Sequence, residues 1–230
     1  MQMIVTLTVL ITVAVYLVLA VMSFINGGLS KKTVVFSILM FLGMFWALEM
    51  LMLDGGSEES FIWISRFNYV VVISIYYTIM MFGLNFLKLT RKQWLLILLI
   101  TALPLLCVYV YAVLGSGALI VSYLDMANAP AKVIVEFAPA GTIGVTLPAL
   151  AYGMTGLAAI IRARKQSTTE YGKKLIGGLL LGFALFFSFN VVFNLVLGNL
   201  HEAHFIGPTS ILLACVPFYR AVVKHGDDEL

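Results

Sequence analysis

Eight side chains inside long apolar stretches of the chain are the best candidates to bind a ligand. Charged and amide groups are costly in hydrocarbon, so in such stretches they face other helices or a cavity and find partners there. Aromatic side chains beside them would supply contact area, and the polar groups would fix the orientation of a ligand. The predicted ligand-binding residues are Trp46, Glu49, Arg66, Tyr69, Tyr76, Asn190, Asn194 and His204.

Helical spacing predicts how some of these residues relate to one another. Arg66, Tyr69 and Tyr76 recur at intervals that place them on one face of a helix. Glu49 and Arg66 lie at matching depths in successive apolar stretches. An ion pair between these two side chains is therefore predicted, because a charge in this setting needs a partner.

The polar residues gather in one half of the apolar stretches. Asn190 and Asn194 are four residues apart, and His204 begins the last stretch at a similar depth to Glu49 and Arg66. This distribution predicts a pocket that opens to one side of the molecule. The alternative is that the same groups hold neighbouring helices together without any ligand.

No enzyme motif is present. The patterns H-E-x-x-H, G-x-S-x-G and the P-loop do not occur. The three histidines lack carboxylate or cysteine partners at metal-ligand spacing, and the last apolar stretch has no central lysine that could form a retinal Schiff base. The chain is therefore predicted not to be an enzyme, with no catalytic residue, metal or cofactor.

Seven apolar stretches position these residues, and each is long enough to cross a bilayer. The chain is 62% hydrophobic and 11% charged, with a mean hydropathy of +1.05, whereas soluble domains are about 25% charged. About twenty apolar residues in a helix cross the roughly 30 Å hydrocarbon core. We predict an all-α seven-transmembrane helix bundle, a single domain over residues 1–230, with spans at 2–25, 33–53, 61–86, 94–114, 138–162, 173–198 and 204–223.

Basic residues predict the orientation of the bundle. Lys and Arg cluster in every second short loop and near the C-terminus, whereas the other loops are mainly acidic or carry histidine. Cytoplasmic loops of membrane proteins are enriched in Lys and Arg. The N-terminus is therefore predicted outside, the C-terminus in the cytoplasm, and the protein in the inner (plasma) membrane as a multi-pass protein. The basic residues of the cytoplasmic loops explain the net charge of +3, so no nucleic-acid partner is predicted.

Two local patterns predict further structure. Residues 118–137 hold two runs rich in β-branched and aromatic residues around a turn-forming linker, which is typical of a short extracellular β-hairpin. Gly178 and Gly182 form a G-x-x-x-G pattern. Close packing within the bundle is the favoured interpretation of this pattern, and a homodimer is the alternative.

The chain resembles the N-terminal seven-transmembrane sensor region of bacterial membrane histidine kinases. The resemblance extends over essentially the full length and rests on motifs without a catalytic signature. These are FWALEM (45–50) with FIW (61–63) and RFNY (66–69), then RAR (162–164) with EYGKK (170–174), and then NVVFN (190–194) with GPT (207–209) and FYR (218–220).

The resemblance implies a role in two-component signal transduction. Such a region senses something outside or within the membrane and passes the signal to a cytoplasmic kinase or related output. The sequence ends at Leu230 without a phosphoacceptor or ATP-binding module, so we expect either a sensor cut from a longer protein or a stand-alone relative.

Together these observations predict a membrane receptor. It would bind a small or lipid-like ligand in the outward-facing pocket and signal to a cytoplasmic output, with the lipid bilayer around it. The alternatives are a small transporter or transporter accessory subunit, and a structural membrane subunit without a ligand. The absence of a clear three-plus-three repeat favours the receptor over the transporter.

Overall fold

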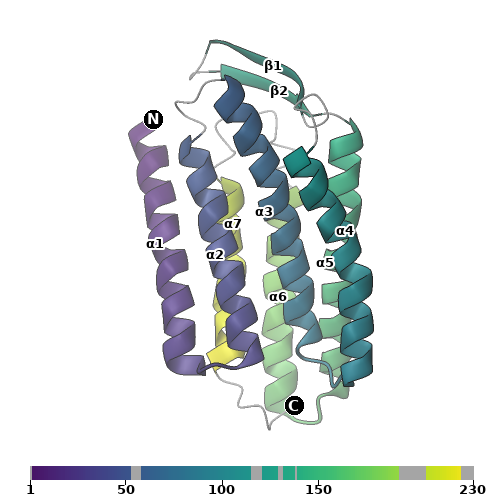
Figure 1. Ribbon diagram of the computed structural model, residues 1–230. Coiled ribbons are helices and arrows are strands. Elements are labelled where there is room, and N and C mark those ends of the chain that lie inside the picture. Colours follow the sequence, from purple (N-terminus) through teal and green to yellow (C-terminus); the bar gives the residue numbers. More distant parts are fainter. Residues whose placement is uncertain are drawn as a thin grey trace.

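The computed structural model describes residues 2–52, 58–114, 121–128, 132–137, 139–191 and 206–223. Within these residues, seven long helices run alternately up and down in one bundle (Figure 1). The seven-helix prediction is confirmed, although residues 53, 138, 192–198 and 204–205 of the predicted spans lie outside the described residues. The helices are α1 (Gln2–Gly27), α2 (Lys31–Met52), α3 (Glu58–Leu84), α4 (Arg91–Leu114), α5 (Pro139–Gln166), α6 (Glu170–Val191) and α7 (Ile206–Val223).

Helices α2, α4 and α6 begin two or three residues before the predicted spans because a hydroxyl residue caps each of them. The hydroxyl oxygens of Ser30 and Thr169 each accept the backbone N–H three residues further on, at 3.2 and 3.0 Å. Thr90 and Gln93 form a capping box, in which Gln93 Oε1 accepts the Thr90 N–H at 2.9 Å. The caps satisfy N–H groups that have no partner within a helix, so the polar first turns are stable.

Helix α3 lies at the centre of the bundle and separates two hydrophobic clusters. It packs against α2 on one side and against α4 and α5 on the other (Figure 1). The first cluster joins mainly α1, α2, α3, α6 and α7, and its fully buried rings are Tyr16, Phe36, Phe82, Phe183, Phe186 and Phe218. The second cluster joins α3, α4 and α5 through Ile73, Met80, Leu84, Val108, Val145, Ala149, Tyr152 and Ala159.

Glycines allow α3 and α5 to approach closely. A Cβ atom added to Gly83 would lie 2.6 Å from the carbonyl oxygen of Gly156, which is closer than real Cβ contacts. At Gly178, one of the two glycines for which close packing is predicted, a Cβ atom would meet none of the described residues within 4 Å, so this position is not closely packed against them. The tight contact thus joins two glycines from different helices and does not use the G-x-x-x-G pattern of α6.

The predicted hairpin is confirmed. Strands β1 (Val121–Asn128) and β2 (Lys132–Phe137) pair antiparallel, with Asp125 opposite Ile134 and Asn128 opposite Lys132. The hairpin crosses the end of the bundle at which the chain begins, above α3 (Figure 1). We refer to this end as the outer end and to the opposite end as the inner end.

The lateral surface of the bundle is apolar. Large side chains such as Ile25, Leu99 and Leu103 are 70%, 73% and 64% exposed. Among the described residues, six helices are long and apolar enough to cross a membrane, namely α1 to α6. An apolar belt around a bundle of this height is what a bilayer requires of a spanning protein.

The arrangement of the helices predicts which loops a reagent can reach. The connections α1–α2, α3–α4 and α5–α6 lie together at the inner end, and the hairpin lies at the outer end (Figure 1). In a background with Cys107 and Cys215 replaced by Ala, Asn128→Cys should react with a membrane-impermeant thiol reagent in intact cells. Thr168→Cys should react only after permeabilisation. Equal labelling of both positions in intact cells would contradict the orientation.

Candidate ligand site

Glu49 is a carboxylate buried near the outer end of α2. Its side chain is 2% exposed, and Nδ2 of Asn68 on α3 donates a hydrogen bond of 3.0 Å to its Oε2 atom. The other carboxylate oxygen, Oε1, is also buried and has no hydrogen-bond partner among the described residues. A buried carboxylate is stable only when its oxygens are satisfied, so Oε1 is a ready acceptor for a donor group.

The predicted ion pair between Glu49 and Arg66 is wrong. In the described part of the chain no contact joins their charged groups, and the Arg66 guanidinium lies over the ring of Trp63 at 4.8 Å from its centroid. Residues at positions i and i+2 point away from each other on a helix. Arg66 therefore cannot face Glu49 where Asn68 does, and it stacks on the residue three positions earlier in α3 instead.

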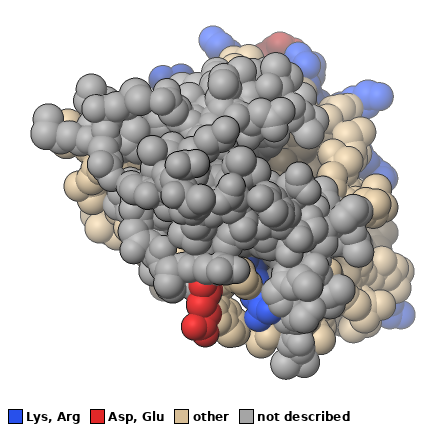
Figure 2. All heavy atoms as spheres, turned by 90° about the horizontal axis from the view of Figure 1, so that it is seen from above, with Lys and Arg blue, Asp and Glu red and all other residues tan. Residues whose placement is uncertain are grey.

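Arg66 itself is only partly satisfied. Its side chain is half-buried, and its Nε atom is buried with no hydrogen-bond acceptor within the described residues. The ring contact with Trp63 stabilises the charge but does not accept the Nε–H group as a carboxylate or carbonyl would. Acidic and basic side chains are visible at the edge of the molecule in the view from above (Figure 2), whereas Glu49 itself is buried. The outer end thus holds both an acceptor and a donor that lack partners in this part of the chain.

The two predicted tyrosines of α3 pack against the hydrophobic clusters of the bundle. Tyr69 and Tyr76 pack against the second cluster, as does Ile73, which confirms that these positions share a face. Tyr76 also contacts α6, where its ring centroid lies 5.5 Å from that of Phe186. Tyr69 therefore packs against the second cluster, whereas Tyr76 packs against both clusters.

The remaining predicted residues are placed only in part. Trp46 is 6% exposed and belongs to the first cluster, one helical turn from Glu49 on α2. Asn190 lies in α6 near the end of its described part, and its side chain is not described. Asn194 and His204 lie outside the described residues. The structure thus joins Glu49 to Asn68, which was not among the predicted site residues, and places Trp46 one turn from Glu49 on α2.

Other polar contacts between helices join two groups that are hydrogen-bonded to each other. Ser74 on α3 and Tyr109 on α4 are joined by a hydroxyl–hydroxyl hydrogen bond of 2.5 Å. The Tyr152 hydroxyl on α5 donates to the carbonyl oxygen of Thr101 on α4 at 2.5 Å. These contacts around the second cluster join neighbouring helices without a ligand, as the alternative to a ligand pocket predicts. They differ from Glu49 Oε1 and Arg66 Nε, which have no hydrogen-bond partner among the described residues.

Aromatic rings and a hydrogen bond between described residues hold the inner end of α7. The Asn26 amide on α1 donates to the Tyr219 hydroxyl at 2.8 Å. Phe218 contacts Phe82 and Phe183, with ring centroids 5.2 and 5.4 Å away, and Phe36 contacts Tyr219 at 6.2 Å. The last helix is therefore coupled to α1, α2, α3 and α6 close to the point where the chain leaves the membrane.

The fold and these features define a multi-pass membrane protein with a polar outer end and a basic inner end. The family model described as the N-terminal 7TM region of histidine kinase matches residues 8–226. The chain therefore belongs to this family, as the motifs of its sequence suggest. It matches no curated protein and no solved structure. The family is one of membrane sensor modules, so the chain is a sensor module of two-component signal transduction in the plasma membrane.

Proposed function

We propose that this sensor module binds a small or lipid-like ligand at the outer ends of α2 and α3. The observation that carries the proposal is the buried Glu49 Oε1 atom, which has no partner among the described residues although Oε2 is held by Asn68. Leaving a buried acceptor unpaired costs roughly 1–3 kcal/mol, and more for a charged group. A ligand that donates a hydrogen bond to this oxygen would recover that free energy on binding.

The neighbouring residues indicate the chemistry of such a ligand. Trp46 would contribute apolar contact area beside Glu49, so we expect a donor group attached to an apolar body. The Nε–H of Arg66 could donate a hydrogen bond to an acceptor on the same ligand. Asn190, Asn194 and His204 remain candidates for further contacts from α6 and from the segment that precedes α7.

Transmission to the inner end would use α7. This helix packs against α1, α2 and α6, and its inner turn is fixed by the Phe218 and Tyr219 contacts. A ligand acts on such a bundle by favouring one of two helix arrangements, and only to the extent that it binds one of them better. A change in the position of α7 would move Arg220 and a histidine kinase or related output attached beyond it.

A thermal-shift screen of small metabolites and lipids on the purified protein tests the ligand proposal. A ligand at a hundredfold excess over Kd should raise stability by about 2.7 kcal/mol. The shift should be lost in Glu49→Met and reduced in Arg66→Met, because these changes remove the acceptor and the donor. Lys88→Gln, an exposed residue at the inner end, is the control and should keep the shift.

A hit whose shift survives in both Glu49→Met and Arg66→Met would contradict this site. The polar groups of α2 and α3 would then serve the interhelical role that the Ser74–Tyr109 contact already illustrates.

A further inference from the structure

The junction of α5 and α6 forms a basic depression at the inner end of the bundle. It is open, has a volume of about 500 Å³, and is lined by Arg164, Glu170, Tyr171, Lys173, Lys174 and Gly177. Volumes of this size are typical of small-molecule sites. The α5–α6 connection, which lies beside these residues in the chain, is at the end of the bundle opposite the hairpin (Figure 1).

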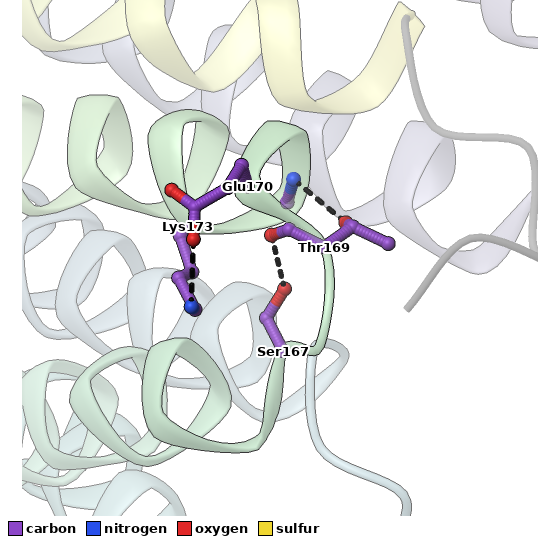
Figure 3. Close-up of polar contacts among 5 residues, drawn as sticks. Ser167, Thr169, Glu170 and Lys173 are labelled. Carbon is purple, nitrogen blue, oxygen red and sulfur yellow. Dashed lines mark hydrogen bonds and ion pairs between the residues drawn. The ribbon is translucent and has the colours of Figure 1, made fainter.

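A capped connection holds the depression in shape. Figure 3 shows Thr169 at the start of α6, where its Oγ1 atom accepts the Gly172 N–H at 3.0 Å and its carbonyl oxygen faces the buried Ser167 hydroxyl at 3.4 Å. A Cβ atom on Gly172 would lie 2.4 Å from Ser167 Oγ, so a larger residue here would displace the hydroxyl that faces the Thr169 carbonyl oxygen. The basic residues on the two helices are thus presented by a compact turn.

The charges of the depression are not neutralised internally. Glu170 is paired with Lys173, with Nζ and Oε1 2.9 Å apart (Figure 3). Arg164 and Lys174 are exposed and have no ion pair with any other residue that the structure describes. The N-terminal end of α6 adds its partial positive charge at the same place. The depression therefore has a surplus of positive charge suited to a phosphate group.

The surfaces beyond the depression are apolar. Along α6, Lys174 is followed at helical spacing by Gly177 and then by Leu181, which is 59% exposed. On α5, Ile161 lies one turn from Arg164 and is 41% exposed. A Cβ atom on Gly177 would meet nothing within 4 Å, so this position leaves open space between the basic residues and the apolar ones.

We infer that the depression binds the headgroup of an anionic phospholipid of the inner leaflet. Arg164 and Lys174 would contact the phosphate, Tyr171 would lie at the interface as aromatic residues do in membrane proteins, and the acyl chains would run along Ile161 and Leu181. A free phosphate would use the same cations but would have no use for the apolar continuation. The inference concerns a site separate from the outer ligand site and does not depend on it.

Titration of the purified protein in neutral detergent with phosphatidylglycerol or phosphatidylcholine, followed by thermal unfolding, tests the site. Phosphatidylglycerol should stabilise the protein at lower concentration than phosphatidylcholine. Each Lys or Arg near an anionic surface is worth about 1 kcal/mol, or about fivefold in affinity. The double variant Arg164→Gln/Lys174→Gln should therefore weaken the apparent affinity for phosphatidylglycerol roughly 25-fold.

Two further variants distinguish a defined binding site from a general attraction between the lipid and the basic residues of the inner end. Arg91→Gln/Lys92→Gln removes two exposed charges at the inner end of α4 and should leave the affinity unchanged. Gly177→Leu keeps every charge but fills the depression, so it should also weaken binding. Equal weakening by both double variants would overturn the inference, and so would an unchanged affinity in Gly177→Leu. Competition by inorganic phosphate at the same concentration as phosphatidylglycerol would also overturn it, because the site would then bind a soluble anion.

Discussion

Replacing Gly83 with Ala is expected to destabilise the folded bundle by about 1–3 kcal/mol, the usual cost of adding atoms to a filled interior. The new Cβ atom would meet the Gly156 carbonyl oxygen at 2.6 Å, and that atom belongs to the backbone of α5. A side chain could rotate away, but a helix backbone must shift as a whole. Alanine gains only about 1 kcal/mol over glycine in helix propensity, so the steric term dominates.

Gly178→Ala is the matched control for this prediction. It is also in a helix, but a Cβ atom there meets nothing within 4 Å, so propensity alone should make the change neutral or slightly stabilising. Thermal unfolding of both variants in the same detergent gives the comparison. Equal midpoints for Gly83→Ala and the unchanged protein would mean that α3 and α5 do not approach this closely.

Much of the fold could be predicted from the sequence because the bilayer sets the length of each apolar stretch. The helix starts at Lys31, Arg91 and Glu170 were missed by two or three residues because the first turns are polar. A signal for them was present in the hydroxyl residue before each start, most clearly in the Thr90–Gln93 capping box. The Gly83–Gly156 contact had no such signal, since it joins helices far apart in the chain.

The sequence predicts how far along their helices the candidate site residues lie, but not which way their side chains point. Hydropathy places Glu49, Arg66 and Asn68 near the outer end, but it does not give the rotation of α3 about its axis. That rotation decides whether Arg66 or Asn68 faces α2, since positions i and i+2 point away from each other. Packing against α2 on one side and α4 and α5 on the other selects Asn68, a choice that depends on all four helices.

Removing the Asn68 amide is expected to cost the bundle about 1.5–3 kcal/mol, the range for a hydrogen bond to a charged group. Asn68→Leu would leave Oε2 of the buried Glu49 carboxylate without its donor, while Oε1 already lacks one within the described residues. Glu49→Met removes the carboxylate itself, so adding it to Asn68→Leu should restore part of the lost stability. Thermal unfolding of the two single variants and the double variant measures the coupling.

The same comparison of two single variants with their double variant, made for Glu49 and Arg66, provides the control. Arg66 stacks on Trp63 and does not contact the carboxylate, so the losses from Glu49→Met and Arg66→Met should add within about 0.3–0.5 kcal/mol. Coupling between Glu49 and Asn68 should instead fall in the range of about 0.5–3 kcal/mol that contacting residues show. Additive losses for Glu49 and Asn68, together with coupling between Glu49 and Arg66, would reverse the assignment. The carboxylate would then belong to the ion pair that depth alone predicts, and Oε1 would no longer be an acceptor available to a ligand.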